Sequence, residues 1–118
     1  MKPLIIANWK MKLLPIEQRR MAAGVVRMMK GRRSPSIALC PTFENLAIVS
    51  DVMKGSPVTL CAQNCFWEER GAYTGEVSPR SLKAMGCRFV LIGHSERRMY
   101  LGETDEMIAK KVAAVEHI

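Results

Sequence analysis

Phe89-Val90-Leu91-Ile92 is a continuous apolar run that leads directly into Gly93-His94-Ser95-Glu96-Arg97-Arg98. An apolar run without alternation is typical of a parallel strand that is buried on both faces. Three earlier runs have the same character, namely Leu4 to Ala7, Ile37 to Cys40 and Val58 to Ala62. The four runs therefore predict four strands of one parallel sheet.

The segments between these runs carry helical patterns. The first segment has apolar residues at the spacing of one helix face, namely Ala22, Val25, Val26 and Met29. Further helices are expected over residues 44–54, from Pro79 to Gly86, and from Thr104 onward, the last with Ile108, Val112 and Val115 on its apolar face. Strand–helix alternation indicates an α/β fold, either a small doubly wound sheet or part of a (β/α)₈ barrel. A length of 118 residues is below the ~200 residues of the smallest complete barrels.

Composition excludes several classes of protein. Hydrophobic residues make up 48% and charged residues 25% of the chain, which is ordinary for a globular protein. The net charge of +7 is scattered, without interleaved aromatic residues, so we expect no nucleic-acid partner. No apolar run approaches the roughly 20 residues of a membrane helix, so we expect no membrane and a cytoplasmic location. The four cysteines are expected to be reduced thiols, with no metal site.

Polar side chains follow three of the predicted strands. Asn8 and Lys10 follow the first, Gln63 and Asn64 follow the third, and His94 follows the fourth. Functional residues of parallel α/β folds gather at the carboxyl ends of the strands. Lys10 and His94 are therefore candidate site residues, although an exposed lysine and a hydrogen-bonded core histidine remain open alternatives at this point.

Longer strings around these residues resemble those of the triosephosphate isomerase family. The resemblance is carried by Ala7-Asn8-Trp9-Lys10-Met11, by Ala62-Gln63-Asn64 followed by Gly71-Ala72-Tyr73-Thr74-Gly75-Glu76-Val77-Ser78, and by Ile92-Gly93-His94-Ser95-Glu96-Arg97-Arg98. The three motifs occur in the order of the family. The resemblance extends over residues 1–118 and implies half of a (β/α)₈ TIM barrel, the N-terminal four units.

This resemblance implies an enzyme of glycolysis and gluconeogenesis that interconverts dihydroxyacetone phosphate and D-glyceraldehyde 3-phosphate through an enediolate. It implies no cofactor and no metal. Lys10 corresponds to the family's lysine beside the substrate phosphate and oxyanion, and His94 to its hydrogen-bond donor to the substrate oxygens. Asn8 corresponds to a substrate contact and Glu96 to the glutamate beside the lysine. Ser95 corresponds to the serine that holds the catalytic base.

The loop from Phe66 to Glu76 corresponds to one that enters a neighbouring subunit in the family, which implies a homodimer. The implied subunit-interface residues are Tyr73, Thr74, Gly75 and Glu76. Aromatic residues beside glycines in this loop are compatible with such an interface. The alternative is a loop that folds over the end of its own barrel.

The family's general base is a glutamate that follows the sixth strand, whereas the sequence reaches only the fourth helix. No glutamate of this sequence follows a fifth or sixth strand, so the role is not assigned to Glu68, Glu69 or Glu103. We therefore expect the 118 residues alone to lack appreciable isomerase activity. The alternative function is a non-catalytic half-barrel, natural or designed, that self-associates through its open first and fourth strands or complements a C-terminal half. A basic binding protein that reuses the fold is a third possibility.

Overall fold

The computed structural model describes all 118 residues and contains a single four-stranded parallel sheet. Its strands are β1 (Leu4–Asn8), β2 (Ser36–Cys40), β3 (Thr59–Ala62) and β4 (Cys87–Val90), and they lie in this order across the sheet. The predicted half of a TIM barrel, with four parallel strands alternating with helices, is confirmed. The fourth strand begins and ends two residues earlier than predicted, next to an irregularity in the register between Leu60 and Cys61.

The segments between the strands and after β4 contain the predicted helices and one more. They are α1 (Pro15–Met29), the 3₁₀ turn η1 (Phe43–Asn45) with α2 (Leu46–Met53), α3 (Pro79–Ala84), α4 (Ser95–Tyr100) and α5 (Asp105–Glu116). The second predicted helix therefore starts as a 3₁₀ turn. Helix α4 was not predicted because it has six residues and none of them is buried, so it shows no apolar stripe.

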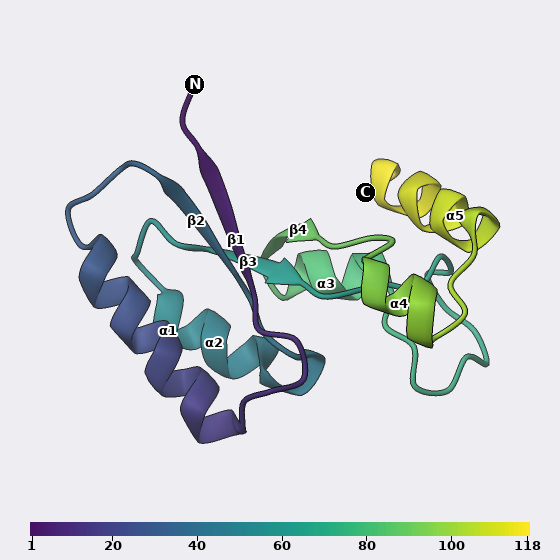
Figure 1. The fold of residues 1–118 in the computed structure, drawn as a ribbon, viewed down its shortest axis with the longest axis horizontal. Helices are drawn as coiled ribbons and strands as arrows, with labels where there is room; N and C mark the ends of the chain where they lie inside the picture. The colour runs from purple at the N-terminus through teal and green to yellow at the C-terminus, as the bar shows by residue number, and fades with distance from the viewer.

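One face of the sheet packs against the helices, and α1 and α2 lie side by side there (Figure 1). The buried core on this face joins the strand residues Leu39, Leu60 and Ala62 to helix residues of α1, α2 and α3, namely Ala22, Met29, Leu46, Val49, Met53 and Leu82. The predicted stripe of the first helix is confirmed, since Val25 and Val26 pack against this core beside Ala22 and Met29.

The opposite face of the sheet has a much smaller core. It consists of Ala38, Cys40 and Cys61, with Phe89 and Leu91 packed against them. All four cysteines are free thiols, as predicted, and all but Cys87 are buried. No helix of the structure is both long and apolar enough to cross a membrane.

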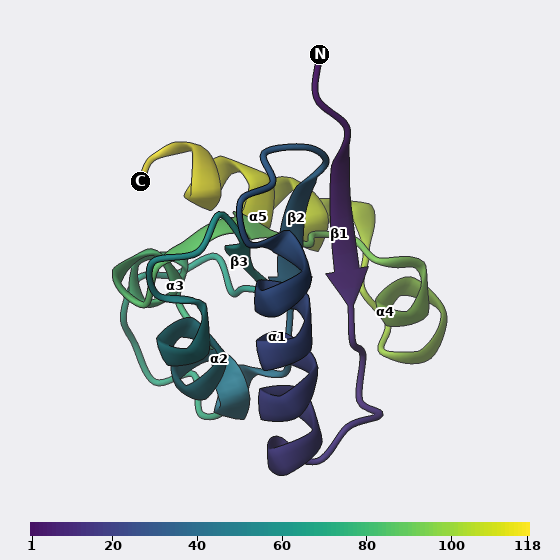
Figure 2. The same cartoon turned by 90° about the vertical axis from the view of Figure 1, so that its left-hand side faces the viewer.

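Strand β1 is an edge strand with only β2 as neighbour, and it lies at the side of the sheet in Figure 2. The prediction that every strand is buried on both faces is wrong for β1, where Leu4, Ile5 and Ile6 are 45%, 50% and 36% exposed. The accessible surface of the whole chain is 7871 Å². A compact monomeric protein of this mass is expected to expose roughly 6,450 Å², so the chain exposes more surface than such a protein would.

Candidate active site

The carboxyl ends of the strands meet at a pocket of about 420 Å³. Its polar lining comes from the segments after β1, β3 and β4, namely Asn8, Lys10, Gln63, Asn64, His94, Glu96 and Arg97, with Met11, Phe43, Tyr100 and Leu101 as apolar or aromatic neighbours. The structure therefore brings Lys10 and His94 together. Because β1 and β4 are the two edges of the sheet, this approach requires the sheet to curve as half of a barrel does.

Lys10 and Glu96 form the central contact of this pocket. The Lys10 Nζ atom donates to Glu96 Oε1 at 2.5 Å, and each side chain is 40% exposed. The hydrogen bond from Lys10 lowers the pKa of the Glu96 carboxyl below its ordinary value, and the charges of Lys10 and Lys12 act in the same direction. Glu96 is therefore a carboxylate at neutral pH and holds the ammonium group inside the pocket.

The backbone of Lys10 has φ = 56°, which makes it the only non-glycine residue of the chain in the left-handed region. Asn8 Oδ1 accepts a hydrogen bond from the Lys10 backbone N–H at 3.0 Å. The Gln63 Nε2 atom donates to the Lys10 carbonyl oxygen at 2.9 Å. Both backbone polar groups of this strained residue are thus bound by side chains that line the pocket.

His94 precedes α4 as its N-cap residue, and its side chain is 29% exposed. Its Nδ1 atom accepts a hydrogen bond from the Glu96 backbone N–H at 3.2 Å. A nitrogen that accepts a backbone N–H carries no proton, so the neutral imidazole has its proton on Nε2. The Glu96 carboxylate is 3.7 Å from Nδ1, too far for a competing hydrogen bond. His94 therefore has a donor available for an oxygen of a bound molecule.

Ser95 is exposed at the first position of α4 and does not line the pocket. The structure thus brings together four of the predicted site residues, Asn8, Lys10, His94 and Glu96, and leaves Ser95 outside. Its expected contact, a catalytic base, stays a prediction. No group of three His, Cys, Asp or Glu side chains gathers in a way that could hold a metal ion.

A buried ionic network lies behind the pocket. Lys111 of α5 is 2% exposed, and its Nζ atom donates to Asn64 Oδ1 at 2.8 Å and lies 3.2 Å from Glu103 Oε1. Arg97 of α4 donates to Glu103 Oε2 at 2.5 Å. Burial alone would raise the pKa of Glu103, but the hydrogen bond from Arg97 and the positive charges of Lys111 and Arg97 outweigh it and lower the pKa. The network fixes α4 and Asn64, in the loop after β3, to α5.

The sequence analysis did not predict that Lys111 is buried, and it placed the neighbouring Val112 on the buried face of the last helix instead. Val112 was predicted on the apolar face of the last helix but is 42% exposed, whereas Lys111 is buried. The available signal was the position of Lys111, which lies three residues after Ile108 and four before Val115 and therefore on their helix face. The prediction about Val112 is wrong, and Lys111 lies on the packed side of α5 because Glu103 and Asn64 provide its charged and polar partners.

The loop from Phe66 to Glu76 packs largely on itself. Phe66 stacks on Trp67 with ring centroids 4.1 Å apart and contacts the Tyr73 ring at 4.6 Å. The Lys110 ammonium group lies 5.3 Å from the centre of the Trp67 ring. A Cβ atom at Gly71 would come within 2.4 Å of the Tyr73 ring, so this arrangement requires a glycine there. Tyr73, Thr74, Gly75 and Glu76 are exposed, and their role in a subunit interface stays a prediction.

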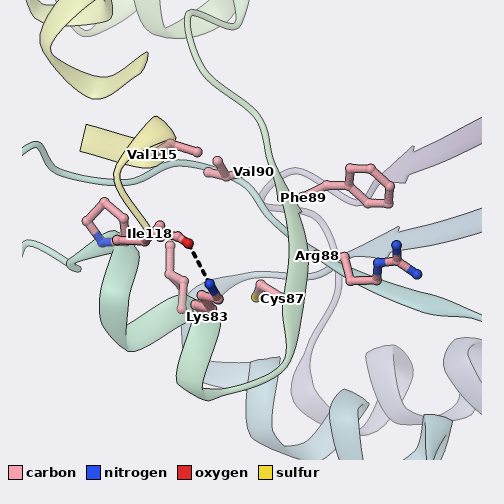
Figure 3. Close-up of a pocket in the computed structure, with 9 residues that line it drawn as sticks. Lys83, Cys87, Arg88, Phe89, Val90, Val115 and Ile118 are labelled. Atoms are coloured by element: carbon pink, nitrogen blue, oxygen red, sulfur yellow. Dashed lines mark hydrogen bonds between the residues drawn. The ribbon is translucent and has the colours of Figure 1, made fainter. Parts of the chain in front are cut away.

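A second pocket lies away from the strand ends, between α3, β4 and the end of α5 (Figure 3). The Lys83 ammonium group donates to the carbonyl oxygen of Ile118 across it, and Leu82, Val90 and Val115 supply apolar lining. No carboxylate or imidazole side chain lines this pocket. Of these two pockets, only the strand-end pocket therefore has a carboxylate and an imidazole in its lining.

The comparisons with known proteins agree with this geometry. A family model described as triosephosphate isomerase matches residues 3–118. The triosephosphate isomerases of Thermoanaerobacter pseudethanolicus and Caldanaerobacter subterraneus are 45% and 46% identical over 117 residues, which is 98% of this chain and 47% of each relative. The triosephosphate isomerase of Pelobacter propionicus is 46% identical over 112 residues, 95% of this chain and 45% of the relative. The chain spans about half the length of the curated relatives it matches.

Proposed function

Because this chain belongs to the triosephosphate isomerase family, we propose that it supplies the lysine and histidine half of an active site that interconverts dihydroxyacetone phosphate and D-glyceraldehyde 3-phosphate. The observation that carries this proposal is the joint placement of Lys10 and His94 around Glu96 in the strand-end pocket. The reaction belongs to glycolysis and gluconeogenesis, and we place it in the cytoplasm. We propose that the chain needs no cofactor.

The chemistry requires charge stabilisation, because removal of a proton next to the substrate carbonyl leaves an enediolate. A preorganised cation and a hydrogen-bond donor directed at the developing charge lower the energy of such an intermediate. The Lys10 ammonium group provides the cation and can also meet the substrate phosphate. The Nε2–H group of His94 provides the donor, since Nδ1 is already engaged by the Glu96 backbone. Asn8 adds a substrate contact from the end of β1.

We also propose that the 118 residues alone are inactive. Glu96 is the only carboxylate side chain that lines the pocket, and Lys10 already engages it. A carboxylate bound in this way is a poor proton acceptor, because its pKa is lowered. The family's base follows the sixth strand, so the complementary half of a barrel is needed to provide it. Ser95 is then free to contact that base.

Reconstitution tests this function. The chain is mixed with the second half of the Thermoanaerobacter pseudethanolicus enzyme, and isomerisation of glyceraldehyde 3-phosphate is followed. We expect activity in the mixture and none in either half. Changing Lys10→Ala or His94→Ala should lower the recovered rate on the order of a hundredfold or more. A mixture that assembles, as judged by sedimentation, but shows no turnover argues against the proposed reaction.

A second candidate function is a non-catalytic half-barrel that self-associates. It is favoured by the accessible surface of 7871 Å² and by the exposed Leu4, Ile5 and Ile6 on the edge strand β1. The family dimer through the loop from Phe66 to Glu76 is the other proposed homo-oligomer. Sedimentation of the chain alone separates these proposals, because Tyr73→Ala should weaken the loop dimer and leave edge pairing unchanged.

A further inference from the structure

Lys10 adopts a backbone conformation that its own side chain does not favour. A left-handed conformation costs roughly 1–2 kcal/mol for a residue with a Cβ atom, and it persists only where the surroundings impose it. Every other residue of the chain with positive φ is a glycine. The direction of the Lys10 side chain depends on this conformation, so whatever holds the backbone also determines where the ammonium group lies.

Gln63 is the residue that reaches this backbone from another strand. Its Nε2 atom donates to the carbonyl oxygen of Lys10 at 2.9 Å and to the carbonyl oxygen of Cys40 at 3.1 Å. One carboxamide NH₂ group therefore joins the ends of β1, β2 and β3. The Cys40 carbonyl also accepts the backbone N–H of Trp9 at 3.1 Å, which brings the segment around Lys10 to the same point.

Gln63 and Asn64 are neighbours in sequence, but they hold different sides of the pocket. Asn64 binds Lys111 and belongs to the buried network behind α4, the helix that carries Glu96. Gln63 binds the segment that carries Lys10. Asn8 accepts the backbone N–H of the same residue, Lys10, but lies only two residues away on the same edge strand. Gln63 is therefore the connection between Lys10 and the interior of the sheet.

We propose that Gln63 is a positioning residue for Lys10. By donating to the Lys10 carbonyl oxygen, it holds the left-handed backbone and thereby keeps the ammonium group on Glu96 and inside the pocket. This effect on the Lys10–Glu96 contact is a property of the chain itself, whereas its effect on turnover rests on the proposed isomerase function. Gln63 itself does not need to touch the substrate for this role.

Two variants distinguish whether Gln63 acts as a hydrogen-bond donor or only fills space. Gln63→Met has a similar length and no polar group, so it removes both hydrogen bonds. Gln63→Glu keeps the shape but directs carboxylate oxygens at two carbonyl oxygens, which repel them. A positioning donor predicts that Gln63→Glu is the more damaging change. A residue that only fills space predicts that the isosteric Gln63→Glu is the milder one.

The matched control is Gln18→Met. Gln18 is fully buried, and its Nε2 atom donates to the Leu13 carbonyl oxygen at 2.8 Å and to Thr42 Oγ1 at 3.0 Å. It therefore makes the same kind of bridge to the segment after β1 but does not contact Lys10. Loss of Gln18 should lower stability without moving the ammonium group, which separates a general structural effect from positioning.

The direct readout is the titration of the Glu96 carboxyl carbon by ¹³C NMR in the 118-residue chain. The Lys10 hydrogen bond lowers the pKa of Glu96, so its loss should raise that pKa toward the ordinary value of 4.5. We expect this rise in Gln63→Met and Gln63→Glu but not in Gln18→Met. An unchanged Glu96 titration in a folded Gln63 variant would overturn the proposal, as would the same rise in Gln18→Met.

The second readout is turnover after reconstitution with the C-terminal half. We expect kcat/KM to fall on the order of a hundredfold in Gln63→Met, as for other small displacements of a catalytic group. Should the unaltered mixture show no isomerisation while the Glu96 titration responds as expected, the proposed function is wrong and the positioning role stands. Should turnover be recovered while the Glu96 titration does not respond to Gln63, the function stands and the positioning role is wrong.

Discussion

The two ends of the Lys10–Glu96 contact are held by different means. Lys10 follows an exposed edge strand and depends on three hydrogen bonds to Asn8, Gln63 and Glu96. Glu96 lies on a helix without a buried residue, but that helix is fixed through Arg97 to Glu103, whose side chain is fully buried. One side of the pocket is therefore held by local strain and polar contacts, and the other by buried charge.

This difference predicts how mutations on each side of the pocket should affect the protein. A buried ion pair gives a unique arrangement only while every partner is present, because an unpaired buried charge is very unfavourable. The contacts of Lys10 are half-exposed, so water can replace each of them at a modest cost. We therefore expect damage to the network behind α4 to reduce stability most, and damage on the Lys10 side to change the pocket more than the fold.

The largest expected effect is that of Lys111→Met. This change keeps the length of the side chain but leaves Glu103 buried with Arg97 as its only cationic partner. Removing one member of a buried ionic network typically costs about 3–5 kcal/mol, which urea denaturation can measure. The control is Lys110→Met, because Lys110 is half-exposed and its ion pair with Glu106 contributes less than about 1 kcal/mol. Equal losses of stability in Lys111→Met and Lys110→Met would contradict the proposed importance of the buried network.

The pH dependence of stability provides the next test. The folded-state pKa of Glu103 lies below its ordinary value of 4.5. The resulting stabilisation is fully present above pH 4.5 and is lost as the pH falls through the lower folded-state pKa. We expect the acid limb of the unfolding curve, followed by circular dichroism, to become shallower in Glu103→Gln. An identical acid limb in the variant would show that Glu103 does not carry this dependence.

Sequence patterns predict the parts of the molecule that depend on local periodicity. The four strands and the apolar face of α1 follow from apolar runs and helical spacing. The burial of Lys111 in place of Val112 could not be predicted in this way. It depends on Glu103 and Asn64, which contact Lys111 from other segments of the chain. The site residues Asn8, Lys10, His94 and Glu96 could be predicted from sequence motifs. The proposed role of Gln63 could be inferred only from its contact with Lys10 in the structure.

On the Lys10 side, Asn8→Ala should have a smaller effect on stability. It removes the acceptor of the Lys10 backbone N–H, a hydrogen bond whose net contribution is about 0.5–1.5 kcal/mol. Because Gln63 still holds the carbonyl side, we expect the Glu96 titration to change less than in Gln63→Met. Urea denaturation and ¹³C NMR measure the two quantities. A loss of stability as large as that of Lys111→Met would remove the difference between the two sides.

The smallest expected effect on stability is that of Leu4→Lys on the exposed part of β1. Leu4 is 45% exposed, so a lysine can reach water there, and we expect a change within about 0.5 kcal/mol. A charge on an edge strand opposes pairing with a second copy. Sedimentation should therefore detect less self-association in Leu4→Lys, while Met28→Lys, at a position of α1 that is 72% exposed, serves as the control. Unchanged association in Leu4→Lys argues that the chain does not associate through β1, and directs attention to the loop from Phe66 to Glu76.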